Sequence, residues 1–263
     1  MSGIEQTFPV FSLISIFVIG LLFGSFFNVV IIRLPQEKSF WGGRSHCTKC
    51  GKLIAWYHNL PLLSFLWLRG KCADCGERIS PQYWIVELVT ALLFVWVYLN
   101  TGLSLNFVGY TIFCSLLLVI SVIDLYHRII PDELSLGGMA AGFVFSFLWA
   151  ETTWVHSLLG ILLGGGVFLA VALFYEKVAG REGLGGGDIK LLGMIGAWLG
   201  FQSILLVILI SSAVGSVVGV VYMIWKKGDL KSAIPFGPFL ALAAFVCAFF
   251  GKGLQYLLYP SIP

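Results

Sequence analysis

The chain has 263 residues, of which 59% are hydrophobic and only 11% are charged, and its mean hydropathy is +0.95. A soluble domain of this length cannot hide so much apolar surface in one core, so the composition indicates a polytopic membrane protein. The net charge of +3 is small, and it indicates no nucleic-acid partner. In a membrane protein the placement of Lys and Arg is more informative than their sum.

The apolar runs predict the membrane helices. A spanning helix needs about 20 apolar residues, and about eight segments are predicted as spans, at 10–32, 83–99, 105–125, 134–150, 157–176, 189–200, 202–225 and 235–258. The sixth is short enough to be a re-entrant segment or a buried half-helix instead. The expected fold is therefore all-α and polytopic, with a first helix in 1–33, a loop at 34–82 and a membrane region at 83–263.

Basic residues orient these helices. With the N-terminus outside and all eight spans retained, every Lys and Arg except Lys252 falls on one side of the membrane. That side is cytoplasmic by the positive-inside rule. Without the sixth span, Lys226, Lys227 and Lys231 would move outside, which favours eight spans over seven.

The loop at 34–82 contains two C-x-x-C-G motifs, Cys47 to Gly51 and Cys72 to Gly76. Two such pairs are typical of a site in which four thiolates bind one tetrahedral zinc ion. Cys47, Cys50, Cys72 and Cys75 are the predicted ligands, and because all four positions are filled the zinc would be structural. Redox chemistry is the alternative, although cytoplasmic thiols stay reduced and disulfides are disfavoured there.

Two acids stand at the edges of apolar runs: Asp124 ends the third span and Asp188 precedes the sixth. A carboxylate in the membrane costs roughly 2.5–3.5 kcal/mol on insertion scales, so such acids are usually functional. The predicted topology places both at one depth on the cytoplasmic side. Asp188 could instead be a helix N-cap after its glycines, and Asp132 is a third candidate or merely a residue of a helix's first turn.

Paired carboxyl groups that share a proton can hydrolyse a peptide bond, because one takes a proton from water while the other protonates the carbonyl. Gly185 and Gly187, just before Asp188, have no side chains and could let an extended substrate approach. A proton-coupled transporter that uses both aspartates is the alternative function. Transporter ion sites prefer the bilayer midplane, however, whereas these acids are predicted near one surface.

Five segments together resemble the type IV prepilin peptidase family, which serves type IV pili and type II secretion. They are GSFFNVVIIRLP at 24–35, the paired cysteine motifs, IDLYHRIIPDELS at 123–135, GLGGGDIKL at 183–191 and IPFGPFLALAAF at 234–245. The resemblance covers almost the whole chain. It implies that Asp124 and Asp188 are the catalytic acids of a G-x-G-D intramembrane aspartic protease, and that the four cysteines form a cytoplasmic metal module.

The resemblance also implies the substrates and the second activity. Family members cut the basic leader of prepilins and pseudopilins after a Gly, at the cytoplasmic surface of the bacterial inner membrane. They then methylate the new amino terminus, using S-adenosylmethionine. These expectations add membrane lipid as a partner and leave a homo-oligomer open.

Overall fold

The structure is a computed structural model that describes residues 10–39, 42, 45–47, 49–149, 151–180, 185–225 and 234–258. Within these ranges the regular elements are helices, accompanied by two isolated β-bridges, so the all-helical expectation is confirmed. The chain forms two compact units, residues 1–111 and 112–263. Several basic residues used to predict the orientation lie outside the described residues: Arg44, Arg181, Lys226, Lys227 and Lys231.

The first unit is built on a pair of antiparallel helices, α1 (Val10–Arg33) and α3 (Gln82–Thr101). Glycines on α1 let the two backbones approach closely: a Cβ at Gly20 would lie 2.6 Å from Ala91 Cα, and one at Gly24 would lie 2.6 Å from Glu87 Cα. Small residues at a spacing of four commonly pack membrane helices in this way. The loop between them carries three short helices: η1 (Leu34–Gln36), η2 (Trp56–Asn59) and α2 (Leu63–Trp67).

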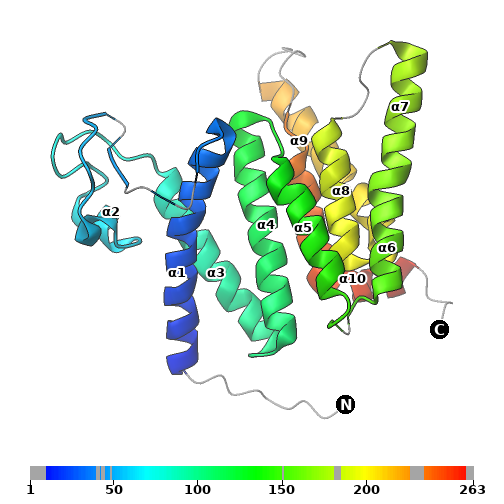
Figure 1. The fold of residues 1–263 in the computed structure, drawn as a ribbon, viewed down its shortest axis with the longest axis horizontal. Helices are drawn as coiled ribbons and strands as arrows, with labels where there is room; N and C mark the ends of the chain where they lie inside the picture. Colours follow the sequence, from blue (N-terminus) through cyan, green and yellow to red (C-terminus); the bar gives the residue numbers. More distant parts are fainter. Residues whose placement is uncertain are drawn as a thin grey trace. The chain divides into compact units, whose positions relative to one another are not determined.

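Helix α4 (Leu105–His127) begins in the first unit and continues into the second. The other helices of the second unit, shown in Figure 1, are α5 (Asp132–Phe145), α6 (Trp154–Ile161), α7 (Phe168–Ala179), α8 (Gly186–Leu199), α9 (Gln202–Trp225) and α10 (Gly237–Leu258). A π-helical turn, Leu162–Val167, joins α6 to α7. Helix α8 is central, since it contacts α5, α6, α7, α9 and α10 and buries most of its side chains.

Polar contacts fix the carboxyl end of α8. The Ser157 hydroxyl donates to the Ala197 carbonyl at 2.7 Å, and the Thr152 hydroxyl donates to the Trp198 carbonyl at 2.9 Å. The last carbonyls of a helix have no partner within the helix, so these hydroxyls satisfy them. The Trp198 ring donates to the Gly138 carbonyl on α5 at 2.9 Å. The segment predicted as a short sixth span is thus a buried helix at the centre of its unit.

Among the described residues, five helices are long and apolar enough to cross a membrane: Val10–Gln36, Gln82–Thr101, Leu105–His127, Trp154–Val178 and Gln202–Trp225. Three of the eight predicted spans do not reach this length within the described residues. Helices α5 and α8 have 14 residues each, and the apolar part described for α10 is Gly237–Gly251. The span predicted at 134–150 ends at Phe145, where the chain turns and Trp149 packs against Trp198 with ring centroids 5.9 Å apart.

Candidate active site and metal centre

The two cysteine motifs fold into matching turns. In the first, the Cys47 N–H donates to the Lys52 carbonyl and the Gly51 N–H donates to the Cys47 carbonyl; Cys72, Gly76 and Glu77 repeat this pattern in the second. Gly51 and Gly76 have φ values of 72° and 71°, a left-handed conformation that glycine adopts without strain. The local sequence therefore makes two equivalent turns, each of which presents two thiols.

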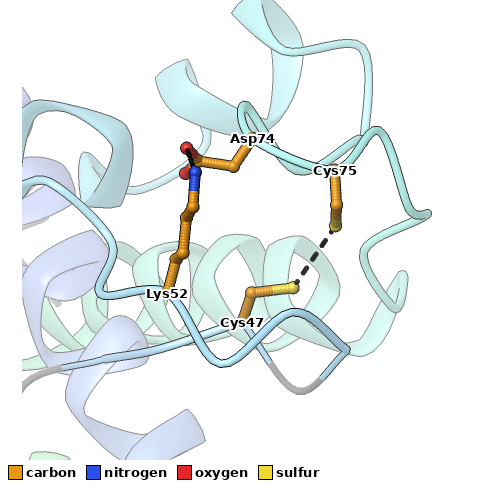
Figure 2. A network of polar contacts seen from close by, with 4 residues as sticks. All are labelled: Cys47, Lys52, Asp74 and Cys75. Carbon is orange, nitrogen blue, oxygen red and sulfur yellow. Dashed lines mark hydrogen bonds and ion pairs between the residues drawn. The ribbon is translucent and has the colours of Figure 1, made fainter.

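The four sulfur atoms of Cys47, Cys50, Cys72 and Cys75 converge. All lie within 4.8 Å of one another, and Cys47 Sγ is 3.8 Å from Cys75 Sγ (Figure 2). Tetrahedral zinc with Zn–S bonds of about 2.3 Å separates its sulfur ligands by about 3.8 Å. The cluster therefore has the donor set and the spacing that zinc requires, with all four positions supplied by protein.

Two further features suit the cluster to a cation. Backbone N–H groups of Cys50 and Lys49 lower the pKa of the Cys47 thiol to about 6, which favours the thiolate that binds metal. Lys52 Nζ lies 2.9 Å from Asp74 Oδ1, so an ion pair joins the two turns (Figure 2). Both of these side chains are largely exposed, so we expect the pair to add little stability.

In the second unit, Asp124 lies near the end of α4 and is 5% exposed. Its Oδ2 accepts a hydrogen bond from the Gly237 N–H, the first residue of α10, at 2.9 Å. A helix leaves its first N–H groups without partners inside the helix, so this carboxylate satisfies one of them. A Cβ at residue 237 would lie 2.6 Å from the same oxygen, which is closer than a real Cβ comes. Only glycine therefore permits this contact without a shift.

Asp188 lies in the first turn of α8 and is partly buried. The N-cap of this helix is Gly185, and Asp188 makes no capping hydrogen bond with its side chain. The interpretation of Asp188 as a helix N-cap is therefore wrong. Its neighbour Gly187 and the Gly237 N–H that donates to Asp124 both lie against Ile130, which places the two acids in one region of the unit.

The Ile130 side chain packs against the segment before Asp188 and against the start of α10, which donates to Asp124. A Cβ at Gly187, next to Asp188, would lie 3.0 Å from Ile130 Cβ, and one at Gly237 would lie 3.4 Å from Ile130 Cδ1. The Ile130 side chain thus touches both the backbone before Asp188 and the backbone that donates to Asp124. The end of α4 and the starts of α8 and α10 meet around this side chain.

Gly185 and Gly187 are explained by the space that a side chain would occupy, and not by an unusual backbone conformation. Gly185 has an ordinary φ of −64°, which any residue can adopt. A Cβ there would lie 3.1 Å from Asp188 Oδ2, and a Cβ at Gly187 would press on Ile130. Gly185 therefore keeps room beside the Asp188 carboxyl group, whereas Gly187 allows close packing.

Asp132 begins α5 and forms an ion pair with Lys190 of α8 at 2.6 Å. This third candidate acid is more than half exposed and links the first turns of α5 and α8. The residues that sequence reasoning did not assign to the site are Gly237 and Ile130. Both lie in the segments on which the resemblance depends, but their contacts with the acids have no signal in the local sequence.

The described residues are mainly helical and include five candidate membrane spans, so the chain belongs to the class of polytopic membrane proteins. It also has a four-cysteine cluster and a pair of carboxyl groups at converging helix ends. Comparison with known proteins defines it further. Residues 18–101 match the Bacterial Peptidase A24 N-terminal domain, and residues 111–220 match the Type IV leader peptidase family. No solved structure matches the chain.

Curated relatives named prepilin leader peptidase/N-methyltransferase match over most of the chain. The protein from Xanthomonas campestris is 38% identical, with 90% of each chain covered. The proteins from Aeromonas salmonicida and Pseudomonas aeruginosa are 33% and 35% identical, and cover 91% and 89% of this chain and 91% and 88% of their own. The chain therefore belongs to the type IV prepilin leader peptidase/N-methyltransferase family, and its function is that of the family. This membership decides against the transporter alternative.

Proposed function

We propose that Asp124 and Asp188 are the catalytic acids of the peptidase. The observation that carries this proposal is their convergence within one unit, with Asp124 held by the Gly237 N–H and both supporting segments packed on Ile130. Two neighbouring carboxyl groups do not both ionise easily, so they share one proton over a range of pH.

Such a pair hydrolyses an amide in two proton transfers. The ionised carboxylate takes a proton from a water molecule, whose oxygen attacks the scissile carbonyl carbon while the protonated carboxyl group donates to the carbonyl oxygen. When the tetrahedral intermediate collapses, the C–N bond breaks and the acid that took the proton from water donates it to the leaving amine. The other carboxylate takes back a proton from a hydroxyl of the intermediate, which restores the pair. Gly185 leaves space beside Asp188 where the substrate backbone enters, and Gly187 keeps this segment close to Ile130.

Family membership suggests the substrate, and the distribution of Lys and Arg suggests the side of the membrane from which it approaches. The protein cuts prepilins and pseudopilins after the Gly that ends a basic leader, where the leader meets the cytoplasmic face of the bacterial inner membrane. The Lys and Arg distribution supports this orientation. In this proposal all eight apolar segments lie within the membrane, and the short helices α5 and α8 are enclosed by longer ones.

Residues 34–82 form the cytoplasmic zinc-binding module between the first helix, in 1–33, and the membrane region 83–263. Cys47, Cys50, Cys72 and Cys75 would hold zinc in a closed structural site, where the ion stabilises a loop too short for its own core. S-adenosylmethionine would supply the methyl group. In the first unit, the buried Asn28 Oδ1 has no hydrogen-bond partner, so an acceptor is available there for an amino group of one of the reactants.

Mass measurement of a prepilin after incubation with the purified protein tests this function directly. Incubation without S-adenosylmethionine should yield the cleaved product, and incubation with it should yield the product heavier by one methyl group. An unchanged prepilin mass in both reactions would refute the peptidase proposal, and cleavage without added methyl would refute the methyl-donor proposal.

A further inference from the structure

The first unit contains a second buried acid, far in the sequence from the proposed peptidase pair. Glu87 lies on α3 and is 7% exposed. No Lys, Arg or His among the described residues lies within 4 Å of its carboxylate. Taking an unpaired carboxylate out of water is costly in free energy, so a buried acid normally has a cationic partner.

A neutral donor holds this carboxylate in place. The Leu62 N–H donates to Glu87 Oε2 at 2.9 Å, and the side chain of Ser25 on α1 lies near the same carboxylate. Leu62 has a φ of 58° and ψ of −47°, and the Leu63 N–H donates to the Pro61 carbonyl across it, so Leu62 is the centre of a strained γ-turn. Thus a loop residue is held in a costly conformation with its N–H directed at Glu87.

A second acceptor lies one helical turn away. Asn28 on α1 is 1% exposed, and its amide nitrogen donates to the Gly24 carbonyl and, at 2.9 Å, to the Tyr83 carbonyl on α3. These two acceptors fix the orientation of the amide, which leaves Asn28 Oδ1 buried without a donor. Such an atom loses the hydrogen bond that it made in water, which destabilises the protein unless a ligand supplies a donor.

The register of α1 against α3 brings the two acceptors together. Gly24 packs on Glu87, and Asn28, four residues later, packs on Tyr83, four residues before Glu87. Residues four apart lie on one face of a helix, so Asn28 and Glu87 occupy neighbouring turns of the same interface. The carboxylate, which has no cation near it among the described residues, and the amide oxygen without a donor therefore lie on neighbouring turns of one helix interface.

We propose that Glu87 and Asn28 Oδ1 bind the α-ammonium group of a methyl-transfer substrate. A primary ammonium offers one positive charge, which matches the carboxylate of Glu87, and three N–H donors, one of which can reach Asn28 Oδ1. Two molecules in the reaction carry this group: the newly exposed amino terminus of the cleaved peptide, and the amino-acid part of the methyl donor. The inference rests on the proposed methyltransferase function and adds a binding site to it.

The test uses the full-length protein with zinc and the Glu87→Gln variant, which keeps the shape and one acceptor but removes the charge. Methylation is measured with a pre-cleaved peptide that has a free amino terminus, and prepilin cleavage is measured separately. We expect the KM for the peptide or for the methyl donor to rise at least tenfold, and cleavage to stay within about twofold of wild type. Thr90→Val is the matched control, because Thr90 is buried on the same helix and its hydroxyl donates only to the Val86 carbonyl.

Competition binding identifies the source of the ammonium group and requires no turnover. Wild type should prefer the free peptide over its N-acetylated form, or S-adenosylhomocysteine over its analogue without the amino group. Glu87→Gln should lose whichever preference wild type shows. Ser25→Ala, which removes a polar side chain near the carboxylate, should weaken the same preference by about threefold.

Two outcomes would overturn the inference: Glu87→Gln that retains wild-type KM values and preferences, or Glu87→Gln that loses cleavage together with methylation. Failure of the proposed methyltransferase function can be distinguished from failure of this inference, because wild type itself would then not methylate the pre-cleaved peptide.

Discussion

Substitution of Gly237 by Ala tests how Asp124 is positioned. The added Cβ would lie 2.6 Å from Asp124 Oδ2 and 3.2 Å from Asp124 Cγ, so the carboxyl group has to move. Movement breaks the 2.9 Å hydrogen bond from the residue 237 N–H. Hydrogen bonds to charged groups contribute about 1.5–3 kcal/mol.

If this energy is lost in the transition state, kcat for prepilin cleavage should fall by about 10- to 150-fold, since each 1.36 kcal/mol is a factor of ten. The KM should change little, because the substrate contacts remain. The measurement is the rate of cleavage at saturating prepilin, with helix content by circular dichroism to confirm folding.

Gly219→Ala is the matched control. Gly219 lies in α9 of the same unit, and a Cβ there would meet nothing within 4 Å. The control should cleave at the wild-type rate and be stabilised by up to about 1 kcal/mol, from the helix propensity of Ala. Wild-type kcat in Gly237→Ala would refute the proposed positioning of Asp124 by α10.

Three further predictions concern the dyad, the metal and the core. Asp124→Asn and Asp188→Asn should each abolish prepilin cleavage without loss of helix content; full cleavage by either variant would remove that acid from the mechanism. Cys72→Ser should release zinc, so elemental analysis that finds one zinc per chain would reject the site. Gly160→Ala should destabilise the protein by about 1–3 kcal/mol or more, because its Cβ would overlap a backbone carbonyl of α8. Gly166→Ala, whose Cβ would meet nothing within 4 Å, should show almost the wild-type thermal midpoint.

Some features follow directly from short stretches of sequence. The apolar runs predicted α1, α3, α4 and α9 within a few residues, because an apolar segment in a bilayer has to satisfy its backbone as a helix. The two C-x-x-C-G motifs predicted a cluster of thiols, since each motif folds as a local turn.

Helix ends were less predictable. The run at 134–150 contains no charged residue, but α5 stops at Phe145 because Trp149 turns inward to Trp198. Thr153 caps α6 and moves its start to Trp154, ahead of the predicted residue 157. Both helix boundaries are set by side-chain contacts, the packing of Trp149 and the cap by Thr153, and not by the limits of the apolar run.

The sequence alone determined that this is a helical membrane protein with paired thiol motifs and acids at the edges of apolar runs. It also carried the motifs of the prepilin peptidase family. Tertiary structure decided which residues support these groups: the Gly237 N–H reaches Asp124 across 113 positions of chain, and Asn28 meets Tyr83 across 55. Local sequence determines that an apolar run forms a helix, whereas packing between helices determines where some helices end and which turns face each other, and this packing depends on several helices together.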